Sequence, residues 1–228
     1  MEYSNKNWYK RWWGVLIVII LAMILFFLAA SAFYFIGEIK NARLKLKQTE
    51  PIRQLAASGQ KYEAANDGYW LGSANAKITI VEFGDFACPV CLQAFPTVRE
   101  ISSKYKNDIK FIWRDYPVVQ DYSDLLALAG RCAGEQGLFW PMHDKLFQNQ
   151  GVDQPDQLAA LANQVGADLK KFNGCFNQQK YLPQIQKDLE DGQSFNIAGT
   201  PTYFINGYKL TGNVPYDIFV KIIEELKK

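Results

Sequence analysis

Histidine and dense basic runs are scarce in this chain. Only one of its 228 residues is a histidine, His143, which excludes most histidine-based catalysis and most zinc chemistry. Lysine and arginine total 25 against 23 acidic residues, for a net charge of +2. Because no Lys/Arg run is dense enough to follow a phosphate backbone, we predict no nucleic-acid partner.

Charge is absent from Trp12 to Ile36, WWGVLIVIILAMILFFLAASAFYFI. At about 1.5 Å per residue this run exceeds a hydrocarbon core of roughly 30 Å, so we predict a transmembrane anchor over 12–36. Aromatic residues gather at both ends of this run, as in the aromatic belts of membrane proteins. At its start are Trp8, Tyr9, Trp12 and Trp13, and near its end is Tyr34. A signal peptide cleaved after Ala30-Ser31-Ala32 is the alternative, but the run is longer than the roughly 7–15 apolar residues of a signal.

Polar residues follow the apolar run. We predict a stalk or linker over 37–70, helical or flexible and interrupted at Pro51. Basic residues lie on both sides of the anchor in nearly equal number, so they do not decide its topology.

The folded domain is predicted to cover 71–228. Residues 77–83 (KITIVEF) are typical of a strand buried on both faces, and apolar residues three apart after Cys88-Pro89 indicate a helix. A second strand at 109–113 makes the opening a β–α–β unit with a parallel sheet. The domain is therefore of the α/β class.

The second half of this domain is predicted to be helical first and to return to strands later. A helical insertion covers about 121–195, with breaks at Gly151, Gly166 and Pro183. Asn206-Gly207 is a strong two-residue hairpin signal, and it predicts paired strands at 202–205 and 208–211. Residues 214–226 then form an amphipathic helix.

Cys88-Pro89-Val90-Cys91 lies where the first strand gives way to the helix. Residues three apart on a helical turn have Cα atoms about 5–6 Å apart, within the range of a disulfide. Cys88 would meet the unpaired N–H groups of the first turn, which lower a thiol pKa from its usual value of about 8.5. We predict Cys88 as the nucleophile and Cys91, inside the turn, as the buried resolving thiol. Pro89 suits the first helical position because its missing N–H would be unpaired there.

Two other uses of this motif remain open. A structural zinc site needs two more ligands, and Cys132 and Cys175 lack the second close pair of a zinc ribbon. A purely structural disulfide would close so short a loop that it constrains the unfolded chain least. A redox-active pair is favoured, and we predict no metal and no cofactor besides the disulfide itself.

Three stretches carry a family resemblance: VEFGDFACPVC, GEQGLFWPMHDKLF and GTPTYFING. Together they resemble the DsbA-like branch of the thioredoxin superfamily over roughly 71–226. The resemblance implies a thioredoxin-like fold with a helical insertion. It also implies a cis Thr200-Pro201 bond facing the cysteines, so that Thr200, Pro201, Pro89 and Val90 contact substrate. An ordinary trans proline opening a strand is the alternative.

The same resemblance assigns Glu82 as a buried carboxylate beneath the active site, able to exchange a proton with Cys91. A solvent-exposed glutamate is the alternative. Cys132 and Cys175 resemble an additional disulfide of some relatives, although two buried free cysteines would also fit. One catalytic and one structural pair suit an oxidising compartment, so we expect residues 1–11 in the cytoplasm and the domain outside.

The function expected from this resemblance is a membrane-anchored thiol–disulfide oxidoreductase that introduces disulfides into exported proteins. A quinone-linked membrane partner of the DsbB or vitamin K epoxide reductase type would reoxidise it. Val90 replaces a histidine of strongly oxidising relatives, which lowers the expected oxidising power and keeps a reductase or isomerase open. A non-enzymatic tethered peptide-binding or chaperone module is a further alternative. For His143 we expect a helix-surface or packing role.

Overall fold

The structure, a computed structural model, describes residues 12–57 and 68–228, with side chains for 12–40 and 68–228. The predicted cytoplasmic residues 1–11 and residues 58–67 of the predicted stalk lie outside the described residues. The chain divides into two units, 1–50 and 51–228, which are described separately below.

Helix α1 (Trp12–Ala57) contains the apolar run. Its segment Val15–Lys40 has a mean hydropathy of 3.1 and is not buried, so it is long and apolar enough to cross a membrane. The helix continues past Pro51, so the predicted interruption there is wrong. A proline has a helical φ and removes a single backbone hydrogen bond, which a long helix can lose without ending.

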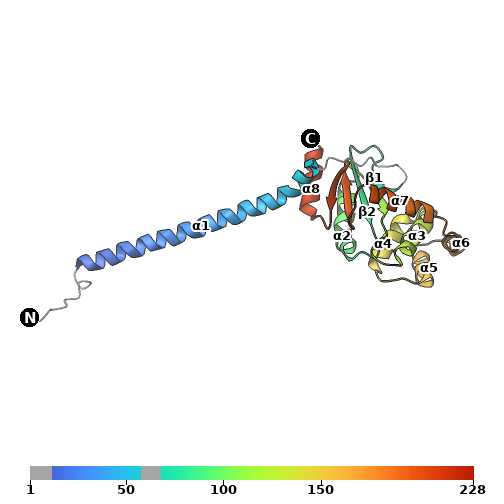
Figure 1. Ribbon diagram of the computed structural model, residues 1–228, viewed down its shortest axis with the longest axis horizontal. Helices are drawn as coiled ribbons and strands as arrows, with labels where there is room; N and C mark the ends of the chain where they lie inside the picture. The colour runs from blue at the N-terminus through green and yellow to red at the C-terminus, as the bar shows by residue number, and fades with distance from the viewer. Residues whose placement is uncertain (1–11, 58–67) are drawn as a thin grey trace, which may run out of the picture. The chain divides into compact units, whose positions relative to one another are not determined.

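A five-stranded sheet forms the centre of the second unit (Figure 1). Its order is β1 (Tyr69–Gly72), β3 (Ile109–Asp115), β2 (Ile78–Gly84), β4 (Thr202–Ile205) and β5 (Tyr208–Thr211). β2 and β3 are parallel, as the predicted β–α–β unit requires, and every other neighbouring pair is antiparallel. Strand β1 was missed, because four half-exposed residues carry little periodicity.

Alternate residues of β2 point to opposite faces of the sheet. Ile78 and Ile80 join a core covered by α2 (Pro89–Lys104) and α8 (Tyr216–Leu226). Val81 and Phe83 join a core on the other face, against which Leu189 of α7 (Leu182–Ser194) packs. Because both faces are covered, the whole strand reads as apolar in the sequence.

Five helices build the insertion between β3 and β4: α3 (Ser123–Gly134), α4 (Phe139–Gln148), α5 (Pro155–Gln164), α6 (Leu169–Asn177) and α7. Gly151 and Gly166 lie in the turns before α5 and α6 with φ of +101° and +90°, conformations that glycine adopts easily. Pro183 opens α7 instead of breaking a helix. The insertion has its own core, which Phe86 and Trp113 join from the sheet side.

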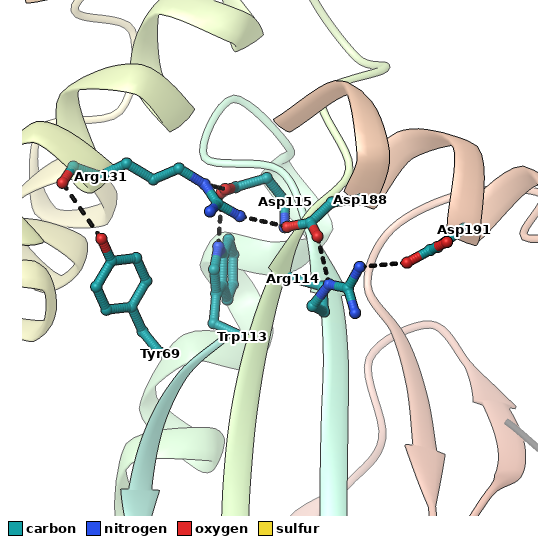
Figure 2. A network of polar contacts seen from close by, with 7 residues as sticks. All are labelled: Tyr69, Trp113, Arg114, Asp115, Arg131, Asp188 and Asp191. Atoms are coloured by element: carbon teal, nitrogen blue, oxygen red, sulfur yellow. Dashed lines mark hydrogen bonds and ion pairs between the residues drawn. The ribbon is translucent and has the colours of Figure 1, made fainter. Parts of the chain in front are cut away.

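A buried network of ion pairs ties the insertion to the sheet (Figure 2). Arg131 of α3 bonds to Asp115 of β3 and to Asp188 of α7, while Arg114 of β3 bonds to Asp188 and Asp191. Trp113 Nε1 donates to the Asp115 carboxylate. Tyr69 Oη donates to the Arg131 carbonyl. Each buried charge therefore has an opposite charge in contact, which its desolvation requires.

Candidate active site

Cys88 occupies the N-cap of α2, just beyond the end of β2. Its backbone is extended (φ −77°, ψ 120°), and its Sγ accepts the N–H of Cys91 at 3.4 Å. Pro89 follows in the first helical turn. The structure thus places Cys88 beside the unpaired N–H groups of a helix start, where a negative charge is stabilised.

The two cysteines of the motif are free thiols with opposite electrostatics. Hydrogen bonds from the Cys91 thiol, the Thr200 side chain and the N–H groups of Cys91 and Val90 outweigh burial and lower the pKa of Cys88 to about 6. Burial, followed by the hydrogen bond to Cys88 and the charge of Glu82, raises the pKa of Cys91 far above the usual thiol range. At neutral pH the first sulfur is mainly a thiolate and the second a thiol.

Thr200 and Pro201 face this pair from the segment before β4. Their peptide bond is cis, and Cys88 Sγ lies 3.3 Å from the Thr200 carbonyl, to which it donates when it is protonated. Among the described residues, none lies in position to make a hydrogen bond with the buried Thr200 hydroxyl. This hydroxyl can therefore donate to the Cys88 thiolate. Pro89 and Val90 are exposed beside the cysteines, with Val90 at 38%. Of the four residues assigned to substrate contact, Thr200 thus contacts the Cys88 sulfur directly, and the other three are chain neighbours of Cys88 or Thr200.

Glu82 lies on β2 and is buried, with 3% of its surface exposed. Burial raises the pKa of Glu82 to about 8, against the opposing effect of the Tyr203 hydroxyl, which makes a long hydrogen bond of 3.5 Å to the carboxyl group. When Glu82 is ionised, its negative charge raises the pKa of Cys91. The carboxyl group is therefore largely protonated at neutral pH, close to the resolving thiol.

Two further residues hold the loop that leads to Cys88, and sequence reasoning missed both. The Asp85 carboxylate accepts the N–H groups of Ala87, Val118 and Val119 at 2.8–2.9 Å. Gln150, after α4, donates to the carbonyls of the same loop. An aspartate directly after a strand is a turn signal that could have indicated the first. The sequence contains no signal for the second.

The remaining cysteines and the histidine lie in the insertion. Cys132 and Cys175 form a disulfide with Cα atoms 5.7 Å apart, joining α3 to α6. His143 is fully buried, packed among the rings of Phe86, Trp113 and other aromatic residues, so its role is packing and not helix surface. In residues 12–40 and 68–228, no three His, Cys, Asp or Glu side chains gather in a way that could hold a metal ion.

Comparison with known families identifies the fold. Residues 64–225 match the family described as thioredoxin. This chain belongs to the thioredoxin family. The crystal structure of oxidised BdbD from Bacillus subtilis is 29% identical with a TM-score of 0.65, covering 75% of this chain and 98% of that one. The thiol–disulfide exchange protein α-DsbA2 from Wolbachia pipientis, 18% identical with a TM-score of 0.64 over 81% and 98% of the two chains, shows the fold alone.

Curated relatives of this thioredoxin-family chain are longer proteins. The Na⁺/H⁺ antiporter NhaA 1 of Salinispora arenicola is 38% identical over 144 residues, which are 62% of this chain and 22% of that protein. The chain thus spans about a fifth of the length of the curated relatives it matches, and the antiporter name belongs to those whole proteins. The predicted fold class, a thioredoxin-like α/β domain, is confirmed.

Proposed function

We propose that this chain is a membrane-anchored thiol–disulfide oxidase that introduces disulfides into exported proteins. The contrast between its two motif sulfurs carries the proposal: Cys88 has a pKa of about 6 and Cys91 a raised one. A thiolate that is stable in the reduced form favours reduction of the enzyme and oxidation of its substrate. The low pKa also makes Cys88 a good leaving group.

The reaction consists of two exchange steps. A substrate thiolate attacks Sγ of Cys88 in the oxidised enzyme, forming a mixed disulfide and breaking the Cys88–Cys91 bond. A second substrate thiolate then attacks the substrate sulfur of that mixed disulfide and releases Cys88 as a thiolate. Two electrons pass to the enzyme, so the substrate gains one disulfide and the enzyme loses one.

Glu82 supplies the proton that the first step needs. Cys91 leaves as a thiolate in a buried site, where its raised pKa makes that charge costly. The Glu82 carboxyl group, with a pKa of about 8, carries a proton at neutral pH and can protonate this sulfur. When the enzyme is reoxidised, the proton returns to the carboxylate.

An exported location fits the apolar helix and the second disulfide. Helix α1 contains a segment able to cross a membrane, and Cys132–Cys175 is a bond typical of oxidising compartments. Residues 1–11 would then be cytoplasmic and the thioredoxin-like domain extracytoplasmic. A quinone-linked membrane partner of the DsbB or vitamin K epoxide reductase type would reoxidise the enzyme, and a shared membrane raises the effective concentration of the two.

Val90 is the observation that favours the second candidate function, a disulfide reductase. Its side chain has no donor for the Cys88 thiolate, so the stabilisation comes from Cys91, Thr200 and the backbone alone. Less thiolate stabilisation means a less oxidising couple, by about 30 mV per pKa unit. We therefore expect an oxidase of intermediate strength.

Equilibration of the full chain in glutathione buffers, in detergent, measures the direction. We expect a reduction potential between about −200 mV and the value of DsbA, about −120 mV. Such a value is well above that of thioredoxin, about −270 mV. A value at or below that of thioredoxin would exclude the oxidase and leave the reductase.

Alkylation of the reduced chain tests the underlying chemistry. The reaction rate of Cys88 with iodoacetamide should rise with pH with a midpoint near 6, the pKa of Cys88, while Cys91 stays unmodified. Peptide mapping identifies the labelled sulfur. A midpoint near an ordinary thiol pKa of about 8.5 would contradict the proposal as a whole.

A further inference from the structure

Gln150 contacts the active-site loop from outside the CxxC helix. It lies in the turn after α4, and its own N–H bonds to the Phe147 carbonyl at 3.3 Å. Its side-chain amide donates to the carbonyl of Phe86 and to that of Cys88, both at 2.9 Å. The side-chain NH₂ group thus bonds to the carbonyls of Phe86 and Cys88, the two residues that flank Ala87.

We propose that Gln150 is a positioning residue for the Cys88 nucleophile, because its amide fixes the backbone carbonyl of that cysteine and that of Phe86. The proposal rests on the proposed function and names a residue of the insertion that supports the same site. It predicts that the insertion, besides covering the site, helps to set the reactivity of Cys88.

The Cys88 carbonyl is the point where this contact acts. It accepts the first helical N–H, that of Leu92, at 3.1 Å, and the Gln150 amide takes its second lone pair. Together the two bonds hold the Cys88–Pro89 peptide plane. That plane sets the N-cap conformation, which in turn aims Sγ at the N–H of Cys91.

The rest of the loop is held in the same way from two sides. The Phe86 ring packs against the rings of Phe147 and Trp113, with centroids 5.2 and 4.8 Å apart, while Gln150 holds the Phe86 carbonyl. On the other side, Asp85 bonds the backbone of Val118 and Val119. The Cys88 N–H donates to the Asp85 carbonyl at 3.0 Å, and Gln150 is the only one of these residues whose side chain bonds to the backbone of the nucleophile itself.

Loss of the amide should raise the pKa of Cys88 in two ways. A freer loop spends less time with Sγ facing the helix N–H groups, and two N–H dipoles directed at this backbone disappear. Both effects destabilise the thiolate and leave the thiol nearly unaffected. A purely structural role would lower the stability of the fold without moving this pKa.

The test compares Gln150→Met with the matched variant Gln136→Met in the full chain. Methionine has a similar length but no donor. The Gln136 side chain also bridges two segments, donating to the Asp168 carbonyl and accepting its N–H, but it makes no described contact with the active-site loop. Thermal unfolding shows that each variant is folded before its thiol is titrated.

We expect Gln150→Met to raise the alkylation midpoint of Cys88 by about 0.5–1 unit, and to make the reduction potential more negative by about 15–30 mV. Gln136→Met should leave both values at those of the wild type. An unchanged midpoint in Gln150→Met overturns the positioning role, whatever its stability. An ordinary midpoint in the wild type overturns the proposed function instead, so the two failures are distinct.

Discussion

Cys88–Cys91 and Cys132–Cys175 are both buried pairs, but they occupy different positions in their helices. Cys88 caps the start of α2, beside exposed Pro89 and Val90. Cys132 and Cys175 lie inside α3 and α6, where the helix N–H groups are already paired. The comparison teaches that burial alone does not separate a reactive thiol from an inert one, and that the unpaired donors of a helix start do.

Sequence separation is the second difference between the pairs. The catalytic candidates are three residues apart, so their bond restricts the unfolded chain very little. The second pair is 43 residues apart and closes a loop across four helices of the insertion. The first pair is thus suited to cycling between states, and the second to stabilising one.

The largest expected effect is the loss of turnover in Cys88→Ser. A serine hydroxyl cannot form the mixed disulfide, so peptide oxidation by this variant should fall to the uncatalysed background. Cys91→Ser cannot form the Cys88–Cys91 bond, so it should not oxidise dithiol peptides either; mixed with a disulfide-bonded peptide, its Cys88 thiolate should displace one peptide thiolate and accumulate as a mixed disulfide, because no Cys91 thiol is left to resolve it. The Cys132→Ser/Cys175→Ser double variant is the control and should stay active. Equal rates for wild type and Cys88→Ser would leave only a tethered binding module.

The second prediction concerns the free energy of unfolding. Replacement of both Cys132 and Cys175 by serine should lower it by about 4 kcal/mol, the chain-entropy value for a loop of this length. Urea unfolding measures the loss, and the alkylation midpoint of Cys88 should remain near 6 in the same variant. A shifted midpoint would show that the two pairs are coupled.

Glu82→Gln should give a smaller effect, of opposite sign. Because burial raises the folded-state pKa of Glu82 from 4.5 to about 8, its contribution to stability is present below pH 4.5 and is lost as the pH rises to about 8. The neutral variant avoids this loss and should gain about 3 kcal/mol at pH 7.

The pH dependence and the rate complete this test. The gain should be absent below pH 4.5 and constant above about 8, as measured by urea unfolding. Disulfide exchange should slow in the same variant, since the proton source near Cys91 is gone. Glu135→Gln, on the surface of the insertion, is the matched control and should change stability little. A pH-independent gain would show that Glu82 is ionised normally.

Local sequence patterns located most elements of the domain. The β-branched run of β2, the proline at the start of α2 and the Asn206-Gly207 turn all depend on neighbours a few residues away. In the structure, Asn206 and Gly207 have φ of +47° and +86°, as a two-residue hairpin turn requires. Edge strand β1 was missed because it is defined by its pairing with β3, some forty residues later in the chain.

The contacts that hold the site together come from distant segments. Gln150 is 62 residues from Cys88, and Thr200 is 112 residues from it. The family resemblance predicted the role of Thr200. It did not predict Gln150, because a glutamine in a polar turn carries no sequence signal that distinguishes it from other surface glutamines. The same holds for the network around Asp188, whose partners lie on β3 and α3.

The sequence alone determined the membrane-length helix, the cysteine spacing and the position of Cys88 at a helix start, because each depends on hydrophobic length or on the geometry of a single turn. The tertiary structure decided that Glu82 is buried, that Cys132 meets Cys175 and that Gln150 and Thr200 flank the nucleophile. Such contacts depend on how the insertion packs against the sheet, and that packing is a sum over many residues that no local pattern encodes.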